Sequence, residues 1–108
     1  MEEIKFLEWE KFDFRIGEIS EVNDHPNAER LYILKVGLGD KEIQLVAGIK
    51  IKYKKEELIG RKIVVFANLE PAKLRGIESN GMLLAADVNG EPFLLTTDKT
   101  VPNGAKVK

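Results

Sequence analysis

Few residues in this sequence could perform covalent or acid–base chemistry. His25 is the only histidine, there is no cysteine, and no serine stands in a G-x-S-x-G context. A Cys–His pair, a cysteine-ligated zinc ion and a nucleophile elbow are therefore excluded. A lone histidine beside Asp24 offers too few ligands for a metal. We expect no catalytic residue and no metal site, and we expect His25 to shape the loop before Pro26.

The glycines of "GLGDKEIQLVAG" do not change this expectation. They form neither a G-x-G-x-x-G pattern nor a phosphate loop with its lysine. We predict that Gly37 and Gly39 serve turn geometry and that the protein has no nucleotide cofactor or other cofactor.

Clustered cations are the stronger chemical signal. Residues 1–49 carry 11 acidic and 6 basic side chains, whereas residues 50–108 carry 7 acidic and 11 basic ones. In "IKIKYKKEELIGRK", Lys50, Lys52 and Lys54 alternate, so an extended conformation would line them along one side. Such a cluster can bind a phosphate backbone by releasing counterions. A well-mixed, solvated surface remains the alternative on charge alone.

The stretch "NLEPAKLRGIESNGMLLAA" adds two cations, Lys73 and Arg75. An arginine there could grip a phosphate bidentately or stack on a base. Ser79 and Asn80 could hydrogen-bond a base edge, and Met82 could offer an apolar platform. The residues alone favour a simpler reading, in which a Ser-Asn-Gly turn precedes a core methionine.

The elements that position these residues are mostly strands. Short apolar runs separated by Gly, Asn, Asp and Pro recur about every ten residues, which is typical of a small all-β barrel or sandwich. Gly17 lies where the alternation slips, so we expect a β-bulge there. Asn89-Gly90 predicts a hairpin turn that returns residues 93–95 onto the preceding strand. The predicted strands are 12–22, 31–38, 42–49, 62–69 and 81–88, with a helix over 54–60.

Two of these elements carry specific packing predictions. In the second strand, Tyr32, Leu34, Val36 and Leu38 should share one face. Near the N-terminus, an extended piece over residues 4–6 and a helical turn over residues 7–11 should tuck Leu7 and Trp9 against the body.

Five strands with a helix between the third and fourth predict an OB-fold, a five-stranded Greek-key barrel, with a double-layer sandwich as the alternative. We expect one domain over residues 1–108, with a barrel core at about 12–88 and flanking segments at about 1–11 and 89–108. No apolar run is long enough for a membrane span. The acidic N-terminus does not resemble a signal peptide, so we expect a cytoplasmic protein without membrane association.

Two blocks of the sequence, "FDFRIGEISEVNDHPNAERLYILKV" and "NLEPAKLRGIESNGMLLAA", resemble the tRNA-binding-domain family. The motifs D-x-R-x-G, H-P-x-A-x-x-L-Y and K-L-R-G-x-x-S-x-G-M-x-L-A-A are specific in combination. That family includes free-standing tRNA-binding proteins and the C-terminal module of methionyl-tRNA synthetase. A free domain of this length is similar to the separate beta subunit of an archaeal-type methionyl-tRNA synthetase, and to a stand-alone tRNA-binding protein.

The resemblance implies an OB-fold that binds tRNA by shape and without catalysis. It implies binding positions at Lys73, Arg75, Ser79 and Met82, to which the charge pattern adds Lys35 and Lys50. Glu70 stands where family members often carry a cation, which weakens the patch.

The resemblance also implies partners. Free-standing relatives are commonly homodimers held by segments outside the barrel, here residues 1–11 and 89–108. A methionyl-tRNA synthetase catalytic subunit is an implied partner. One branch of the family resembles an export-related chaperone, so a protein-binding dimer is the alternative to tRNA binding. An enzyme that acts on small substrates is a further alternative, but the sequence contains no group of titratable residues that would support it.

Overall fold

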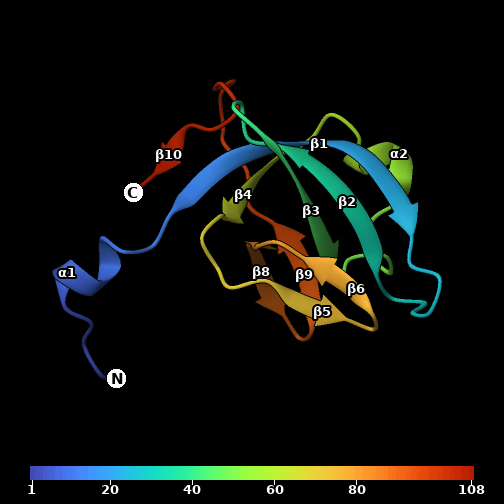
Figure 1. Ribbon diagram of the computed structural model, residues 1–108, viewed down its shortest axis with the longest axis horizontal. Helices are drawn as coiled ribbons and strands as arrows, with labels where there is room; N and C mark the ends of the chain where they lie inside the picture. Colours follow the sequence, from blue (N-terminus) through green and yellow to red (C-terminus); the bar gives the residue numbers. More distant parts are fainter.

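The computed structural model describes all 108 residues and shows an all-β, OB-like barrel (Figure 1). Its main sheet is antiparallel, with the strand order β3-β2-β1-β4-β7. A short helix, α2, lies between β3 and β4, as predicted. The bounds are β1 (Phe14–Asp24), β2 (Tyr32–Gly37), β3 (Glu42–Ala47), α2 (Lys55–Leu58), β4 (Lys62–Phe66) and β7 (Met82–Leu83).

The core lies inside this barrel and follows the alternation predicted for the second strand. Tyr32, Leu34, Val36 and Leu38 are all buried, whereas Lys35 between them is exposed. They join a cluster of 13 buried apolar residues that also includes Leu58 from α2. The helix is short because both of its ends are fixed locally. At its start, the Glu57 side chain accepts the Lys54 N–H at 2.9 Å. Beyond its end stands Gly60, with a φ of +85°.

The bulge in β1 is not at Gly17, as we predicted, but between Ile19 and Glu21, where the register with β2 shifts. Gly17 pairs regularly with Ile63 of β4. A Cβ at Gly17 would lie 2.5 Å from the Val36 Cγ1 atom. Close packing against β2 therefore requires a glycine at this position. Because glycine has no side chain, it interrupts the apolar alternation in the sequence, as a bulge would.

The predicted fifth strand divides at Leu84. Its first part, β7, pairs with β4, and its second part, β8 (Ala85–Val88), pairs with β9 (Glu91–Leu94). The Asn89-Gly90 turn is confirmed, since both residues have positive φ, +54° and +84°, as a two-residue hairpin turn of this kind needs. A further strand, β10 (Lys106–Val107), pairs with the start of β1.

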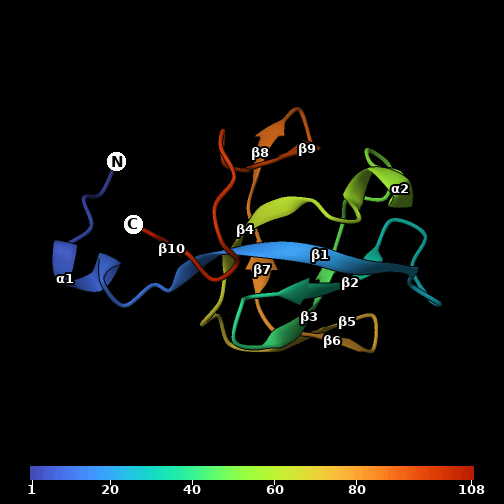
Figure 2. The same cartoon turned by 90° about the horizontal axis from the view of Figure 1, so that it is seen from above.

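A hairpin that the sequence did not predict follows β4. It consists of β5 (Ala72–Leu74) and β6 (Ile77–Ser79), where we expected a loop. Seen from above, it lies beside β3 (Figure 2).

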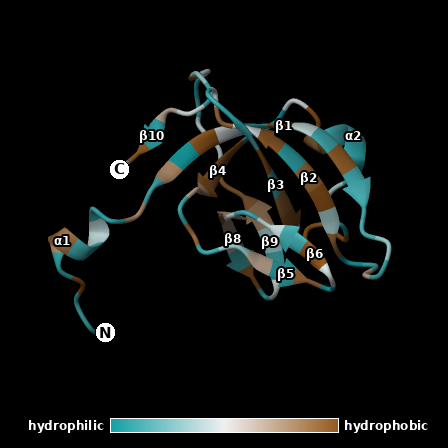
Figure 3. Cartoon of the chain, in the orientation of Figure 1, coloured by the Kyte–Doolittle hydropathy of each residue, from teal (hydrophilic) through white to brown (hydrophobic).

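The N-terminal segment projects from the barrel as an arm (Figures 1 and 3). Its helix, α1 (Phe6–Trp9), buries no residue, and Leu7 is 74% exposed, so the predicted tucking of Leu7 is wrong. Trp9 does pack against the start of β1, as predicted, with its ring centroid 5.5 Å from that of Phe14 and 6.2 Å from that of Phe12. No helix has the length and apolar character needed to cross a membrane.

Candidate nucleic-acid interface

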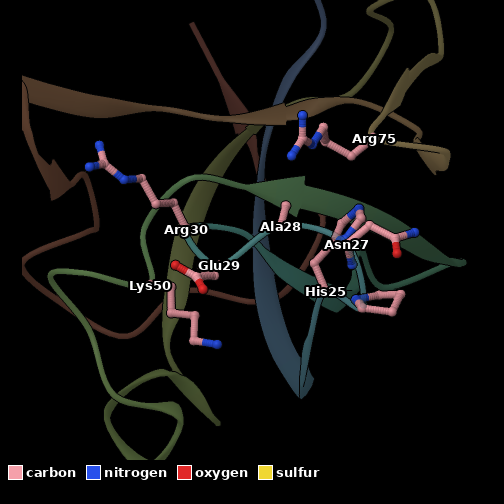
Figure 4. Close-up of a pocket in the computed structure, with 8 residues that line it drawn as sticks. His25, Asn27, Ala28, Glu29, Arg30, Lys50 and Arg75 are labelled. Atoms are coloured by element: carbon pink, nitrogen blue, oxygen red, sulfur yellow. The ribbon is translucent and has the colours of Figure 1, made fainter.

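A polar groove of about 590 Å³ opens at the end of β1. One side is the β1–β2 loop, and the other is the tip of the β5–β6 hairpin (Figure 4). Three cations reach it from three segments: Arg30 from the loop, Lys50 from beyond β3 and Arg75 from the hairpin. Glu29 is the one acidic lining residue. Two predicted site residues, Lys50 and Arg75, meet in this groove.

The hairpin tip holds Arg75 in a tight two-residue turn. Leu74 pairs with Ile77, and the residues between them, Arg75 and Gly76, have φ of +53° and +91°. Two consecutive positive φ values are typical of the two-residue hairpin turn whose backbone twist matches the twist of the strands that it joins. An arginine in this conformation is uncommon, and the turn presents its exposed side chain at the edge of the groove.

The base of the hairpin is attached to β3 through Ser79. The Ser79 hydroxyl accepts the Val46 N–H at 3.0 Å and donates to the Gly81 carbonyl at 2.9 Å. The Asn80 N–H donates to the Gln44 carbonyl at 2.8 Å. Ser79 is only 4% exposed, so its hydroxyl is fully engaged inside the protein. Its place in the structure fits support of the hairpin better than direct contact with RNA.

Met82 lies on the surface, at 52% exposure, so the reading of a core methionine is wrong. It borders an apolar hollow of about 260 Å³ beside the hairpin, together with Leu74, Ile49 and Pro92. An exposed thioether next to a cationic groove can contact a base face. Leu74 joins the two concavities, because it lines the hollow and precedes Arg75 in the groove.

The predicted row of alternating lysines does not form, because residues 50–54 turn instead of extending. The Lys52 and Tyr53 amides both donate to the Ile49 carbonyl, at 3.1 and 3.0 Å. Lys50 turns to Asp24 at 3.0 Å, whereas Lys52 lies 3.7 Å from Glu91 and 4.4 Å from the Phe93 ring centroid. Lys50 and Lys52 therefore lie in separate surroundings.

Asp24 pairs with two lysines, of which Lys50 lines the groove. Its carboxylate lies 3.0 Å from the Lys50 Nζ and 3.1 Å from the Lys55 Nζ. Hydrogen bonds from Lys50 and then from Lys55 hold the pKa of Asp24 below its ordinary value. Asp24 is therefore ionised at neutral pH and already pairs with Lys50 in the free protein.

The remaining predicted cations and Glu70 lie outside the groove lining. Lys73 is exposed on β5 opposite Glu78 of β6, outside the groove lining. Lys35 is exposed on the outer side of β2, between Glu21 of β1 and Gln44 of β3. Glu70 is exposed just before the hairpin and also lies outside the lining. Arg75 and Lys50 are thus the two predicted site residues that the groove brings together.

Two residues of the groove were missed as site residues. Arg30 forms no ion pair and lines the groove. Its place in the loop between the first two strands could have identified it, because that loop flanks the binding face of OB-folds. His25 shapes its loop as predicted, with Nδ1 accepting the Asn27 N–H at 3.0 Å, but it also reaches the hairpin.

The arrangement can bind an anion. Arg30, Lys73 and Arg75 carry charges without a carboxylate partner within 4.0 Å. Unpaired guanidinium groups suit phosphates, because their donors match phosphate geometry. No three His, Asp or Glu side chains gather in a way that could hold a metal.

Comparison with known proteins agrees with a nucleic-acid interface. The family model described as "Putative tRNA binding domain" matches residues 14–106. Methionine–tRNA ligases from Thermococcus kodakarensis and Methanocaldococcus jannaschii are 58% and 49% identical over 100% of this chain. The chain spans 15% and 17% of the length of these two curated relatives.

Solved structures give the same fold over the whole chain. A MetRS related protein from Pyrococcus horikoshii has a TM-score of 0.93 at 34% identity and covers 100% of both chains. The chaperone CsaA from Bacillus anthracis has a TM-score of 0.92 at 27% identity, covering 99% of this chain and 100% of its own. The match over residues 14–106 and the similarity over full-length structures show that this chain belongs to the tRNA-binding-domain family.

Proposed function

We propose that this protein is a non-catalytic module that binds tRNA by its shape, using the groove between the β1–β2 loop and the β5–β6 hairpin. The observation that carries the proposal is the convergence of Arg30, Lys50 and Arg75 from three segments on one concave site. Lys73 and Lys35 extend the contact onto the hairpin and the outer side of β2. Met82 meets a nucleotide beside the groove, and Ser79 holds the hairpin in place.

The physical basis of this affinity is largely electrostatic. Cations that contact phosphates release counterions, so binding is strong at low salt and weakens as salt rises. Recognition by shape needs no base-specific hydrogen bonds, and it suits a groove whose cationic side chains come from three separate segments.

The partner in the cell is a methionyl-tRNA synthetase catalytic subunit, which this module serves as a beta subunit or as a trans-acting cofactor. The support is the similarity to methionine–tRNA ligases over the whole of this chain. The module holds the tRNA in the cytoplasm while the catalytic subunit acts on it. Recovery of that synthetase with the tagged protein from native lysate is the expected result, and its absence would contradict this partner.

The N-terminal arm supports the proposal of a homodimer. Ile4, Phe6 and Leu7 are 67%, 69% and 74% exposed. The arm also carries a mostly apolar hollow of about 620 Å³, which is lined by Ile4, Phe6, Glu8, Trp9 and Phe12. An exposed apolar patch of this kind marks an interaction site. A second copy brings the same patch and closes the interface by two-fold symmetry. Two grooves on one tRNA then gain affinity through effective concentration.

The alternative function is that of a chaperone-like dimer that binds unfolded protein. The likeness to the chaperone CsaA favours it, and so do the exposed apolar residues of the arm. The two functions predict different competition. Unfolded peptide should not displace tRNA from the groove, whereas displacement would favour the chaperone function.

The direct test is a salt titration of tRNA binding with the double variant Lys73→Ala/Arg75→Ala. Removing two phosphate contacts should weaken binding by about tenfold or more at low salt and flatten the log–log salt slope by about 1.4 to 1.8. The matched control is Lys5→Ala/Lys11→Ala on the arm, which removes the same charge. Equal effects of the two pairs, or unchanged binding in both, would reject the groove as the tRNA site.

A further inference from the structure

His25 lies between the two sides of the groove and bonds to both. Its Nδ1 accepts the Asn27 N–H at 3.0 Å within the β1–β2 loop. Its Nε2 lies 2.9 Å from the carbonyl oxygen of Leu74, 49 residues away in the hairpin. The side chain is only 5% exposed although it lines a polar groove. One imidazole therefore spans the base of the candidate site.

The two partners determine which ring nitrogen carries the proton. A backbone N–H is a donor, so Nδ1 must be unprotonated to accept from Asn27. A carbonyl oxygen is an acceptor, so Nε2 must carry the hydrogen that it donates to Leu74. Both bonds are satisfied together only by the neutral Nε2–H tautomer.

The bond to Leu74 is the only hydrogen bond from the hairpin tip to the rest of the protein. The other hydrogen bonds between hairpin and barrel lie at its base, where Gln44 donates to the Glu78 carbonyl and Ser79 and Asn80 bond to β3. Arg75 follows Leu74 directly and stands at the tip. The position of Arg75 relative to Arg30 therefore depends on a contact that His25 makes.

We propose that His25 is a positioning residue for tRNA binding, which sets the spacing of Arg75 and Arg30 across the groove through its bond to the Leu74 carbonyl. This inference rests on the proposed function of the groove and adds a residue that touches no RNA. A flexible tip would lose freedom on binding, and that ordering lowers affinity. His25 removes this cost because the tip is already held in the free protein.

Two substitutions separate the bonds of His25. His25→Asn keeps a short acceptor that can take the Asn27 N–H in an Asx-turn but cannot reach the hairpin. His25→Gln places an amide donor at the distance of Nε2, so it can still donate to the Leu74 carbonyl but loses the short acceptor. We expect tRNA affinity to fall by about tenfold in His25→Asn and to stay within about twofold in His25→Gln. The reverse order, or equal effects of both substitutions, would overturn the proposal.

Measurements on the free protein test the link without tRNA. The backbone amides of Arg75 and Gly76 should become more mobile in His25→Asn than in His25→Gln, as seen by ¹⁵N relaxation. The ring ¹⁵N shifts of the unmodified protein should report the Nε2–H tautomer, and an Nδ1–H tautomer would reject the proposal even if the variants do not fold. If the unmodified protein binds no tRNA, the proposed function fails, whereas these measurements still decide whether His25 restrains the tip.

Discussion

The two ends of β1 present surfaces of opposite character. At the Asp24 end, the groove is lined by His25, Arg30 and Arg75 and by little apolar surface. At the Phe14 end, four aromatic rings gather, with Phe14 and Phe66 centroids 5.0 Å apart and Trp9 and Phe12 beside them. Figure 3 shows the second end continuing into the partly hydrophobic arm.

This difference would allow one small barrel to separate two kinds of binding. An 11-residue strand is roughly 35 Å long. That length is several times the Debye length of about 8 Å at physiological salt, so charges at one end scarcely act at the other. The charged end suits a polyanion, whose binding depends on salt. The apolar end suits a protein surface, whose binding depends on buried area. Variants at one end should therefore leave the function of the other end largely intact.

The largest expected effect is at the apolar end. Phe6→Glu/Leu7→Glu places charges on two exposed arm residues that no core contact holds. Burying them in a dimer would then be unfavourable, so the dimer dissociation constant should rise by about 100-fold or more. Sedimentation velocity measures the change. Ile59→Glu, at an exposed apolar position on the barrel, is the control, and a dimer that survives the arm variant would place the interface elsewhere.

The next effect is on stability at the charged end. Ser79→Ala removes the acceptor of the buried Val46 N–H, so the free energy of unfolding should fall by about 1–3 kcal/mol. Urea denaturation of this variant, compared with Ser20→Ala at an exposed serine, measures the loss. Equal stability of the two variants would show that the base of the hairpin is not held by this hydroxyl.

A gain of affinity is expected when Asp24 is neutralised. Asp24→Asn releases Lys50 and Lys55 from their shared carboxylate, so tRNA affinity should rise by about threefold. Asp98→Asn changes the net charge equally and is the control for a general charge effect. A rise of the same size in both variants would argue against a local competition.

The pH dependence of this pairing has a definite sign. The pKa of Asp24 is lowered in the folded protein, so its contribution to stability is present above the unfolded pKa and is lost as pH falls through the folded value. Lowering the pH from about 7 to 5 should therefore not reproduce the gain expected of Asp24→Asn. Binding measured across this range, with Asp24→Asn in parallel, provides the check.

The smallest effect is expected at Glu70. This residue is exposed and lies outside the groove lining, so Glu70→Gln should raise tRNA affinity by less than about twofold. A rise as large as that of Asp24→Asn would instead extend the tRNA contact along the loop before β5.

Local sequence signals predicted the elements that depend on local physics. The alternation from Tyr32 to Leu38 identified β2 and its buried face, and Asn89-Gly90 identified the β8–β9 turn. The family motifs identified Arg75, which lines the groove. The prediction of a row formed by Lys50, Lys52 and Lys54 was wrong. The alternation of lysines in the sequence is compatible with both a strand and a turn. It therefore could not predict the turn that places Lys50 beside Asp24.

The features that the sequence did not predict depend on contacts between distant residues. The β5–β6 hairpin is attached through Ser79 to Val46, 33 residues away, and through His25 to Leu74, 49 residues away. Its turn, Arg75-Gly76, lacks the Asn-Gly pair that marks a hairpin from sequence. Gly17 likewise depends on Val36, which β2 brings against it after the chain has folded back. Contacts of this kind, between residues far apart in the sequence, can be identified only from the three-dimensional arrangement of the strands.

The pairing of β10 with the first residues of β1 has a practical consequence. Val107 lies opposite Phe14, so both chain ends leave the molecule from the aromatic side (Figure 1). A fluorescent label, a surface anchor or a larger polypeptide joined to either terminus would stand at the far end of β1 from Arg30 and Arg75. The protein can thus be attached to a surface through either terminus while its groove stays accessible. It is therefore suited to binding assays with immobilised protein, and the order of its chain need not be changed.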